Sequence, residues 1–154
     1  MTTYTTYTDG RTIAKGSGAN AAGFPAATVL VGEYDATKRN TTAADVIEVI
    51  TVPKGTFVSA VFTETLTADA SQTIHVGDGS DDDGWLVSAD VGTAANLSGS
   101  ALTLGEAAPN TITGYTSGKF YSAADTIDIT VPTSKALDTL KVRVYAVCTI
   151  LGVA

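Results

Sequence analysis

Polar and apolar residues alternate with a period of two along several stretches of the chain, the spacing of a β-strand with one buried face. The clearest stretch spans residues 140–150, where the charged residues lie only at the beginning. Its second half is apolar on both faces, which is typical of a central strand or of one at an interface. On one face we place Leu140, Val142, Val144, Ala146, Cys148 and Ile150.

Turn residues separate further predicted strands about every ten positions. Residues 46–52 form a β-branched run that ends at Pro53, because proline has no N–H for a sheet ladder. In residues 56–66 we expect Phe57 and Val61 on one face, and Val58, Ala60, Phe62 and Leu66 on the other. The remaining predicted strands are 73–76, 85–87, 101–104, 111–114, 119–121 and 126–131.

About eight short strands without a convincing helix predict an all-β sandwich or barrel. Residues 88–95 have room for a helical turn, which Gly92 disfavours. Residues 41–154 are therefore expected to form one β-sandwich domain, which 154 residues are enough to build.

Residues 1–40 show no sustained period, apart from one short apolar segment at 27–31. We interpret them as an extended N-terminal arm. A disordered linker is usually poor in aromatic residues, whereas this arm carries several, so we expect it to dock on a protein surface. The contact candidates are Tyr4, Tyr7, Phe24 and Tyr34.

The charge pattern argues against binding to nucleic acid, which needs clustered Lys and Arg to neutralise phosphates. The formal net charge is −7, with +1 in residues 1–40 and −8 in the rest. No run of about eighteen apolar residues suggests a membrane span, and the Thr-rich N-terminus lacks the apolar core of a secretory signal. We therefore expect a protein assembled in a cytoplasm, with a surface rich in Thr and poor in charge.

The acidic loop at residues 77–84 is the strongest candidate for metal chemistry, because Ca²⁺ prefers several oxygen ligands. Its spacing does not fit an EF-hand, which needs Gly at the sixth position and Glu at the twelfth. An exposed hairpin turn is the competing interpretation, and we assign no cofactor. The candidate ligands are Asp78, Asp81, Asp82 and Asp83.

No constellation of catalytic residues is recognisable. His75, the single histidine, falls in an alternating strand without a nucleophile motif beside it. Cys148, the single cysteine, has the place of a buried apolar residue. Trp85 could form a sugar-stacking platform, but we favour a core aromatic that anchors the strand after the acidic loop. We expect no enzymatic activity.

Taken together, these segments resemble the capsid decoration (cement) proteins of tailed bacteriophages. The similarity covers residues 45–151. It rests on the turn at 52–55, the strand 57–66, the segment 74–79 with its Asp-rich turn, Trp85, and the strands 124–129 and 140–150.

This resemblance implies a jelly-roll-like antiparallel β-sandwich that assembles as a homotrimer. It also implies a place on the outer surface of the virion, where such a protein binds the major capsid protein and bridges its subunits. The arm is not covered by the resemblance, and we expect it to contact the capsid or a neighbouring subunit. Two alternatives remain: a head-fibre or tail component that contacts the host, and a carbohydrate-binding β-sandwich module.

Overall fold

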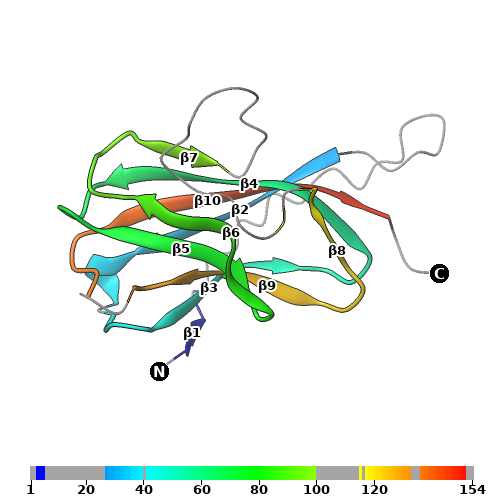
Figure 1. Ribbon diagram of the computed structural model, residues 1–154, viewed down its shortest axis with the longest axis horizontal. Coiled ribbons are helices and arrows are strands. Elements are labelled where there is room, and N and C mark those ends of the chain that lie inside the picture. Colours follow the sequence, from blue (N-terminus) through cyan, green and yellow to red (C-terminus); the bar gives the residue numbers. More distant parts are fainter. Residues whose placement is uncertain are drawn as a thin grey trace.

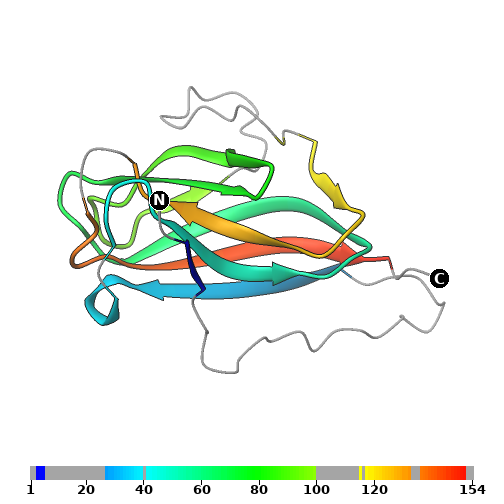
Figure 2. The same ribbon diagram turned by 90° about the horizontal axis from the view of Figure 1, so that it is seen from below.

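The computed structural model describes residues 27–39, 41–99, 115, 117–132 and 136–151, together with the backbone of residues 3–5. Its strands form two sheets that face each other (Figures 1 and 2). Sheet A has the strand order β1-β3-β9-β5-β6, and sheet B has the order β2-β10-β4-β7. The short strand β8 also pairs with β4 and extends sheet B. The chain is an all-β sandwich, as its sequence predicts.

The strands of sheet A are β1 (Thr3–Thr5), β3 (Val46–Val52), β9 (Asp125–Thr130), β5 (Thr73–Asp78) and β6 (Asp81–Asp90). Those of sheet B are β2 (Ala27–Asp35), β10 (Lys141–Ile150), β4 (Thr56–Thr67), β7 (Leu97–Gly99) and β8 (Lys119–Tyr121). A 3-10 turn, η1 (Ala36–Lys38), follows β2. Within the described part of the chain, no helix has the length and apolar character needed to cross a bilayer.

The strand pairing is nested, which identifies the sandwich as a jelly roll. β2 pairs with β10, β3 with β9, β4 with β7, and β5 with β6, all antiparallel. The chain between β2 and β10 is thus one long antiparallel hairpin wound around a common core. β1 lies outside this scheme because it pairs in parallel with β3.

The predicted strands at 46–52, 56–66, 73–76, 85–87, 119–121, 126–131 and 140–150 all correspond to strands of the structure. The 140–150 strand is central, since β10 lies between β2 and β4, and its predicted inward face is buried from Leu140 to Cys148. Residues 88–95 contain the end of β6 and no helical turn. The strands expected at 101–104 and 111–114 lie outside the described residues.

The predicted faces of β4 are wrong because the strand contains a bulge. Val147 of β10 is opposite Ala60 and Cys148 is opposite Val58, so Ser59 is an extra residue. A bulge of this kind moves every later side chain to the other face. Val58 and Val61 are therefore both buried, whereas Phe57 and Phe62 lie half-exposed on the outer face of sheet B.

The expected boundary between arm and domain at residue 40 also needs correction. β2 pairs with β10 along its whole length, from Ala27 opposite Thr149 to Asp35 opposite Lys141. The sandwich therefore includes residues 27–35. Gly32 of β2 packs so closely on the Val49 carbonyl of β3 that a Cβ would collide with it, and this contact holds the edge of sheet B against sheet A.

Candidate binding surfaces

Charge is divided unequally between the two sheets. The strands of sheet A contain eight carboxylates and no Lys or Arg, whereas those of sheet B contain three acidic and three basic residues. Sheet A is therefore the acidic side of the sandwich, and sheet B is close to neutral. The net charge of the sequence alone does not reveal this division, because it depends on which strands pair.

The outer face of sheet B is apolar over much of its area. Val29 on β2 is 42% exposed, Leu97 on β7 is 65% exposed and Phe120 on β8 is 50% exposed. Between these edges, the register places Val29, Val147 and Ala60 side by side in one row, and Val31, Tyr145 and Phe62 in the next. Exposed apolar side chains scattered singly are ordinary, but a contiguous group is typical of an interaction surface.

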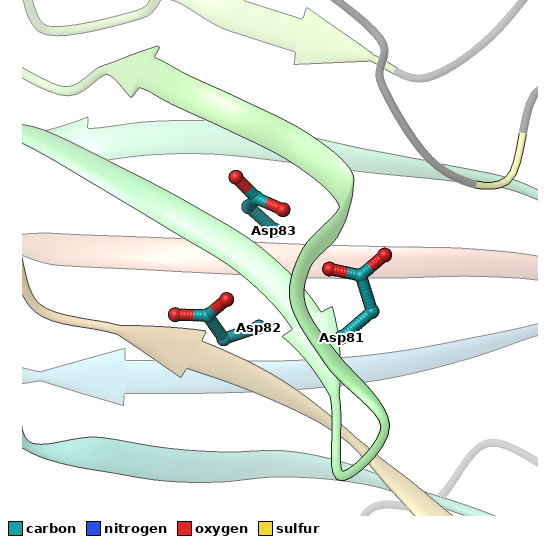
Figure 3. A group of neighbouring side chains, drawn as sticks. All are labelled: Asp81, Asp82 and Asp83. Atoms are coloured by element: carbon teal, nitrogen blue, oxygen red, sulfur yellow. The ribbon is translucent and has the colours of Figure 1, made fainter.

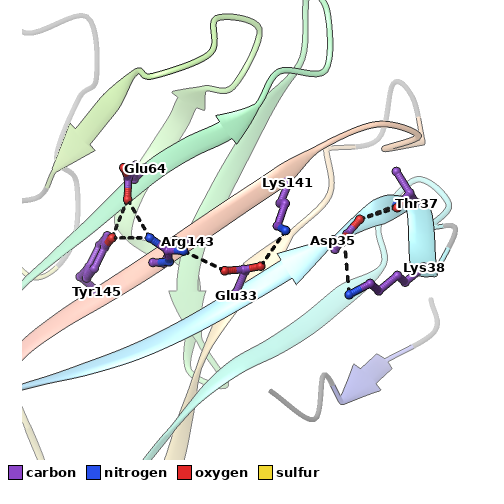
Figure 4. Close-up of polar contacts among 8 residues, drawn as sticks. All are labelled: Glu33, Asp35, Thr37, Lys38, Glu64, Lys141, Arg143 and Tyr145. Atoms are coloured by element: carbon purple, nitrogen blue, oxygen red, sulfur yellow. Dashed lines mark hydrogen bonds and ion pairs between the residues drawn. The ribbon is translucent and has the colours of Figure 1, made fainter. Parts of the chain in front are cut away.

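A network of charged side chains crosses the same face at one end (Figure 4). Arg143 of β10 lies 3.1 Å from Glu33 on β2 and 3.5 Å from Glu64 on β4. The Tyr145 hydroxyl donates to Glu64, and Lys141 lies 3.2 Å from Glu33. Burial alone would raise the pKa of Glu33, but the hydrogen bonds from Arg143 and Lys141 lower it. The charges on this face thus balance one another, which leaves the apolar rows as its distinguishing feature.

The side chains of Asp81, Asp82 and Asp83 gather at the start of β6 (Figure 3). Their ligand atoms all lie within 4.8 Å of one another. Burial and the neighbouring Asp81 carboxylate raise the pKa of Asp83. Exposed acidic groups in a turn commonly cluster without a metal, and these three are partly or fully exposed.

Asp78, the fourth predicted metal ligand, points away from this cluster into a buried network. Its carboxylate accepts hydrogen bonds from Ser80 N and the Tyr115 hydroxyl on one oxygen, and from Lys119 Nζ and the Tyr121 hydroxyl on the other. Burial would raise the pKa of Asp78, but the hydrogen bonds from Lys119, Ser80 and Tyr121 hold it below its usual value. With these partners, Asp78 is a structural anion rather than a metal ligand.

Asp128 on β9 is a buried carboxylate that is not among the site residues predicted from the sequence. It is 5% exposed, and its Oδ1 atom has no hydrogen-bond partner. Burial raises its pKa to about 6; a hydrogen bond with Thr126 opposes this shift, and the negative charges of Glu48 and Asp125 add to it. Its position between Ile127 and Ile129 was visible in the sequence, but its burial on the outer side of a sheet was not.

Of the four predicted contact residues, the structure describes the side chain of one, Tyr34. Tyr34 is a core residue and no surface contact: it is 1% exposed, and its hydroxyl donates to the Arg39 carbonyl. Tyr4 belongs to β1, of which the structure describes the backbone alone. Tyr7 and Phe24 lie outside the described residues, so their role stays a prediction.

The other singled-out residues occupy structural positions. Trp85 is completely buried, and its indole N–H donates to the Tyr121 hydroxyl at 3.3 Å. Its predicted role in the core is confirmed, and the alternative hypothesis that Trp85 forms a sugar-stacking platform is wrong, because the ring is not exposed. His75 Nδ1 accepts a hydrogen bond from Ser88 N. Cys148 is buried, as predicted, and burial raises the pKa of its thiol.

A scan against models of protein families and a search of curated proteins each found no match. Among solved structures, a chain of the cyanophage Pam1 capsid asymmetric unit matches with a TM-score of 0.57 and 21% identity, over 82% of this chain and 86% of that one. This fold is one found in phage capsids.

Two further capsid structures contain the same fold. A chain in the capsid of Ralstonia phage GP4 matches with a TM-score of 0.57 and 12% identity, over 84% of this chain and 86% of that one. A chain in the acid-stable capsid of Helicobacter pylori bacteriophage KHP30 matches with a TM-score of 0.55 and 11% identity, over 85% and 94%. High coverage of both partners means that these chains are of similar length to this one.

Proposed function

We propose that this chain is a structural virion protein of a tailed bacteriophage, a decoration (cement) protein that binds the outer surface of the icosahedral capsid. The observation that carries this proposal is the jelly roll shared, over more than four-fifths of each partner, with chains of three phage capsids. The protein would act by binding and not by catalysis, in keeping with the structural positions of His75 and Cys148.

The apolar outer face of sheet B is the surface that we propose to lie against the capsid. Burial of its exposed Val29 and Phe120 side chains would lower the free energy of the complex, because apolar surface is removed from water. The ion pairs of Arg143 with Glu33 and Glu64 balance one another, so the interface would contain no large unpaired charge. Sheet A, with its carboxylates, would face solvent, where charges are hydrated. Major capsid subunits are the proposed partner of sheet B.

A homotrimer is the assembly that we propose on the capsid, with residues 6–26, which follow β1, reaching toward the capsid or a neighbouring copy. Tyr7 and Phe24 would anchor this segment, and Tyr4, whose strand β1 pairs with β3 of sheet A, would contact a neighbouring copy. Three copies joined in one assembly can bridge several capsid subunits, and linked contacts raise the effective affinity by about 10²–10⁴ without new chemistry. Light scattering coupled to size-exclusion chromatography measures this assembly directly, and a monomer at micromolar concentration would contradict the trimer.

Binding is tested by mixing the purified protein with capsids that lack it, followed by sedimentation and electron cryomicroscopy. We expect the wild-type protein to cosediment and to appear as density on the outer surface. Val29→Lys should weaken binding to the capsid at least tenfold. The substitution replaces an apolar side chain of the proposed contact face with a charged one, which would have to be buried in the interface.

Thr51→Lys is the matched control, since Thr51 is exposed on sheet A and the charge change is identical. Equal binding by wild type and Val29→Lys would reject sheet B as the contact face. The absence of wild-type density on the capsid would reject the decoration function itself.

A further inference from the structure

Asp128 lies in an unusual position for a buried carboxylate. Its neighbours along β9, Ile127 and Ile129, are both fully buried in the core between the sheets. Because successive side chains of a strand point to opposite faces, Asp128 points to the outer side of sheet A. It is nevertheless 5% exposed, so other parts of the chain must cover it there.

The strand register identifies two of its neighbours on that outer side. Glu48 of β3 is directly opposite Asp128 on one side, and Gly77 of β5 is directly opposite on the other. Gly77 lies between Val76 and Asp78, whose side chains are buried, so a Cβ at residue 77 would point outward. Such a Cβ would collide with the main-chain carbonyls of Asp81 and Asp82. The start of β6 therefore folds over Gly77, beside Asp128, and presents carbonyl oxygens on this face.

Two buried side-chain oxygens on this side of sheet A lack hydrogen-bond partners. Asp128 Oδ1 and Thr130 Oγ1 are both buried without a hydrogen bond, and the two residues share one face of β9. A buried carboxylate oxygen without a donor is costly. Like charges directly opposite each other on neighbouring strands, as with Glu48 and Asp128, are destabilising as well.

From this arrangement we infer a site for a hard divalent cation of the Ca²⁺ class on the outer side of sheet A, with Asp128 as its principal ligand. Ca²⁺ binds carboxylate, carbonyl and hydroxyl oxygens in flexible geometries. Glu48 and the main-chain carbonyls of Asp81 and Asp82 are the other candidate ligands. The cation would satisfy the partnerless oxygen of Asp128 and separate it electrostatically from Glu48.

The proposed site differs from the exposed group of Asp81, Asp82 and Asp83 side chains. Those carboxylates face solvent in part and carry no orphaned buried oxygen, whereas Asp128 is almost completely buried. Asp83→Asn and Asp128→Asn therefore make a matched pair: each removes one negative charge with nearly unchanged shape, one in the exposed cluster and the other in the proposed site.

The test is thermal unfolding at pH 7.5 in EDTA and in excess CaCl₂, with calorimetric titration of CaCl₂ into the folded protein. At a hundredfold excess over the dissociation constant, we expect Ca²⁺ to raise the Tm of the wild type by about 5 °C or more. Asp83→Asn should keep this shift, and Asp128→Asn should lose it. Glu48→Gln should weaken Ca²⁺ binding at least fivefold.

Asp128→Asn is expected to fold, because it removes an unpaired charge, and in EDTA its Tm should equal or exceed that of the wild type. If the wild type shows neither a Tm shift nor calorimetric heat with Ca²⁺, the proposed site is wrong. The buried carboxylate of Asp128 would then be neutralised by a proton and not by a cation. An unchanged Ca²⁺ response in Asp128→Asn would overturn it too. Loss of the response in Asp83→Asn alone would assign the cation to the exposed cluster and reject Asp128.

Discussion

The ammonium group of Lys119 lies 2.6 Å from Asp78, whose carboxylate side chain is completely buried. This pair joins the end of β5 in sheet A to β8, which is bound to sheet B. The same ammonium group lies 4.4 Å from the centre of the Tyr115 ring, and that ring meets Trp85 edge to face at 4.9 Å. One polar network thus connects the two layers of the sandwich beside its apolar core.

Lys119→Met should destabilise the protein by about 3 kcal/mol, because it leaves the buried charge of Asp78 without its cation. Urea unfolding followed by circular dichroism measures this loss. Lys141→Met is the control, since Lys141 pairs with Glu33 on a half-exposed surface and should cost at most about 1 kcal/mol. A similar decrease in the free energy of unfolding in the two variants would show that the Lys119–Asp78 pair stabilises the protein no more than a surface ion pair does.

The stability contributed by Asp78 should disappear in acid. Its pKa in the folded protein is below the ordinary value of 3.8, so the folded state favours the ionised form. The contribution is complete well above pH 4 and is lost as the pH falls through 3.8 toward the lower folded value. We expect the difference in unfolding free energy between wild type and Asp78→Asn to narrow between pH 5 and pH 2.5. A difference that stays constant or grows in acid would contradict the assignment.

The fluorescence of Trp85 should report a buried indole. Trp85 is the single tryptophan of the chain and is completely buried. We expect blue-shifted emission and weak quenching by acrylamide in the native protein, with a red shift on unfolding. Addition of soluble glycans should leave the spectrum unchanged, whereas a saturable change would restore the carbohydrate-binding alternative.

Gly32→Ala should destabilise the sandwich by about 2–3 kcal/mol, because the new methyl group meets the rigid Val49 carbonyl of the opposite sheet. Gly99→Ala offers a contrast, since its methyl group would meet the Phe62 ring, a half-exposed side chain that can rotate away. Thermal unfolding of both variants tests the difference. If Gly32→Ala were the milder change, the close approach of β2 to β3 would be in doubt.

Much of the secondary structure could be predicted from local sequence. The alternation in residues 140–150 and the β-branched run at 46–52 favour extended backbone without reference to the rest of the chain, and both are strands. Trp85 could be assigned to the core because a large aromatic side chain gains most by burial. The strand β7 was missed, since three residues are too few to show a period.

The candidate site residues were harder to predict. Asp78 and Asp81 are neighbours in one acidic loop, yet Asp78 binds Lys119, forty-one positions away, and Asp81 stays in the exposed group. Tyr34 looks like an arm residue until β2 is seen to pair with β10. In each case the deciding contact is with a residue distant in the sequence.

The sequence by itself determined that this chain is built from strands, where most of them lie, and that its C-terminal strand is buried on its inward face, because alternation and β-branching act over a few neighbouring residues. The tertiary structure alone decided which strands pair, that Ser59 shifts the faces of β4, that the carboxylates gather on one sheet, and that Asp128 is covered. Pairing and bulges depend on contacts between segments far apart in the chain, and no local pattern encodes them.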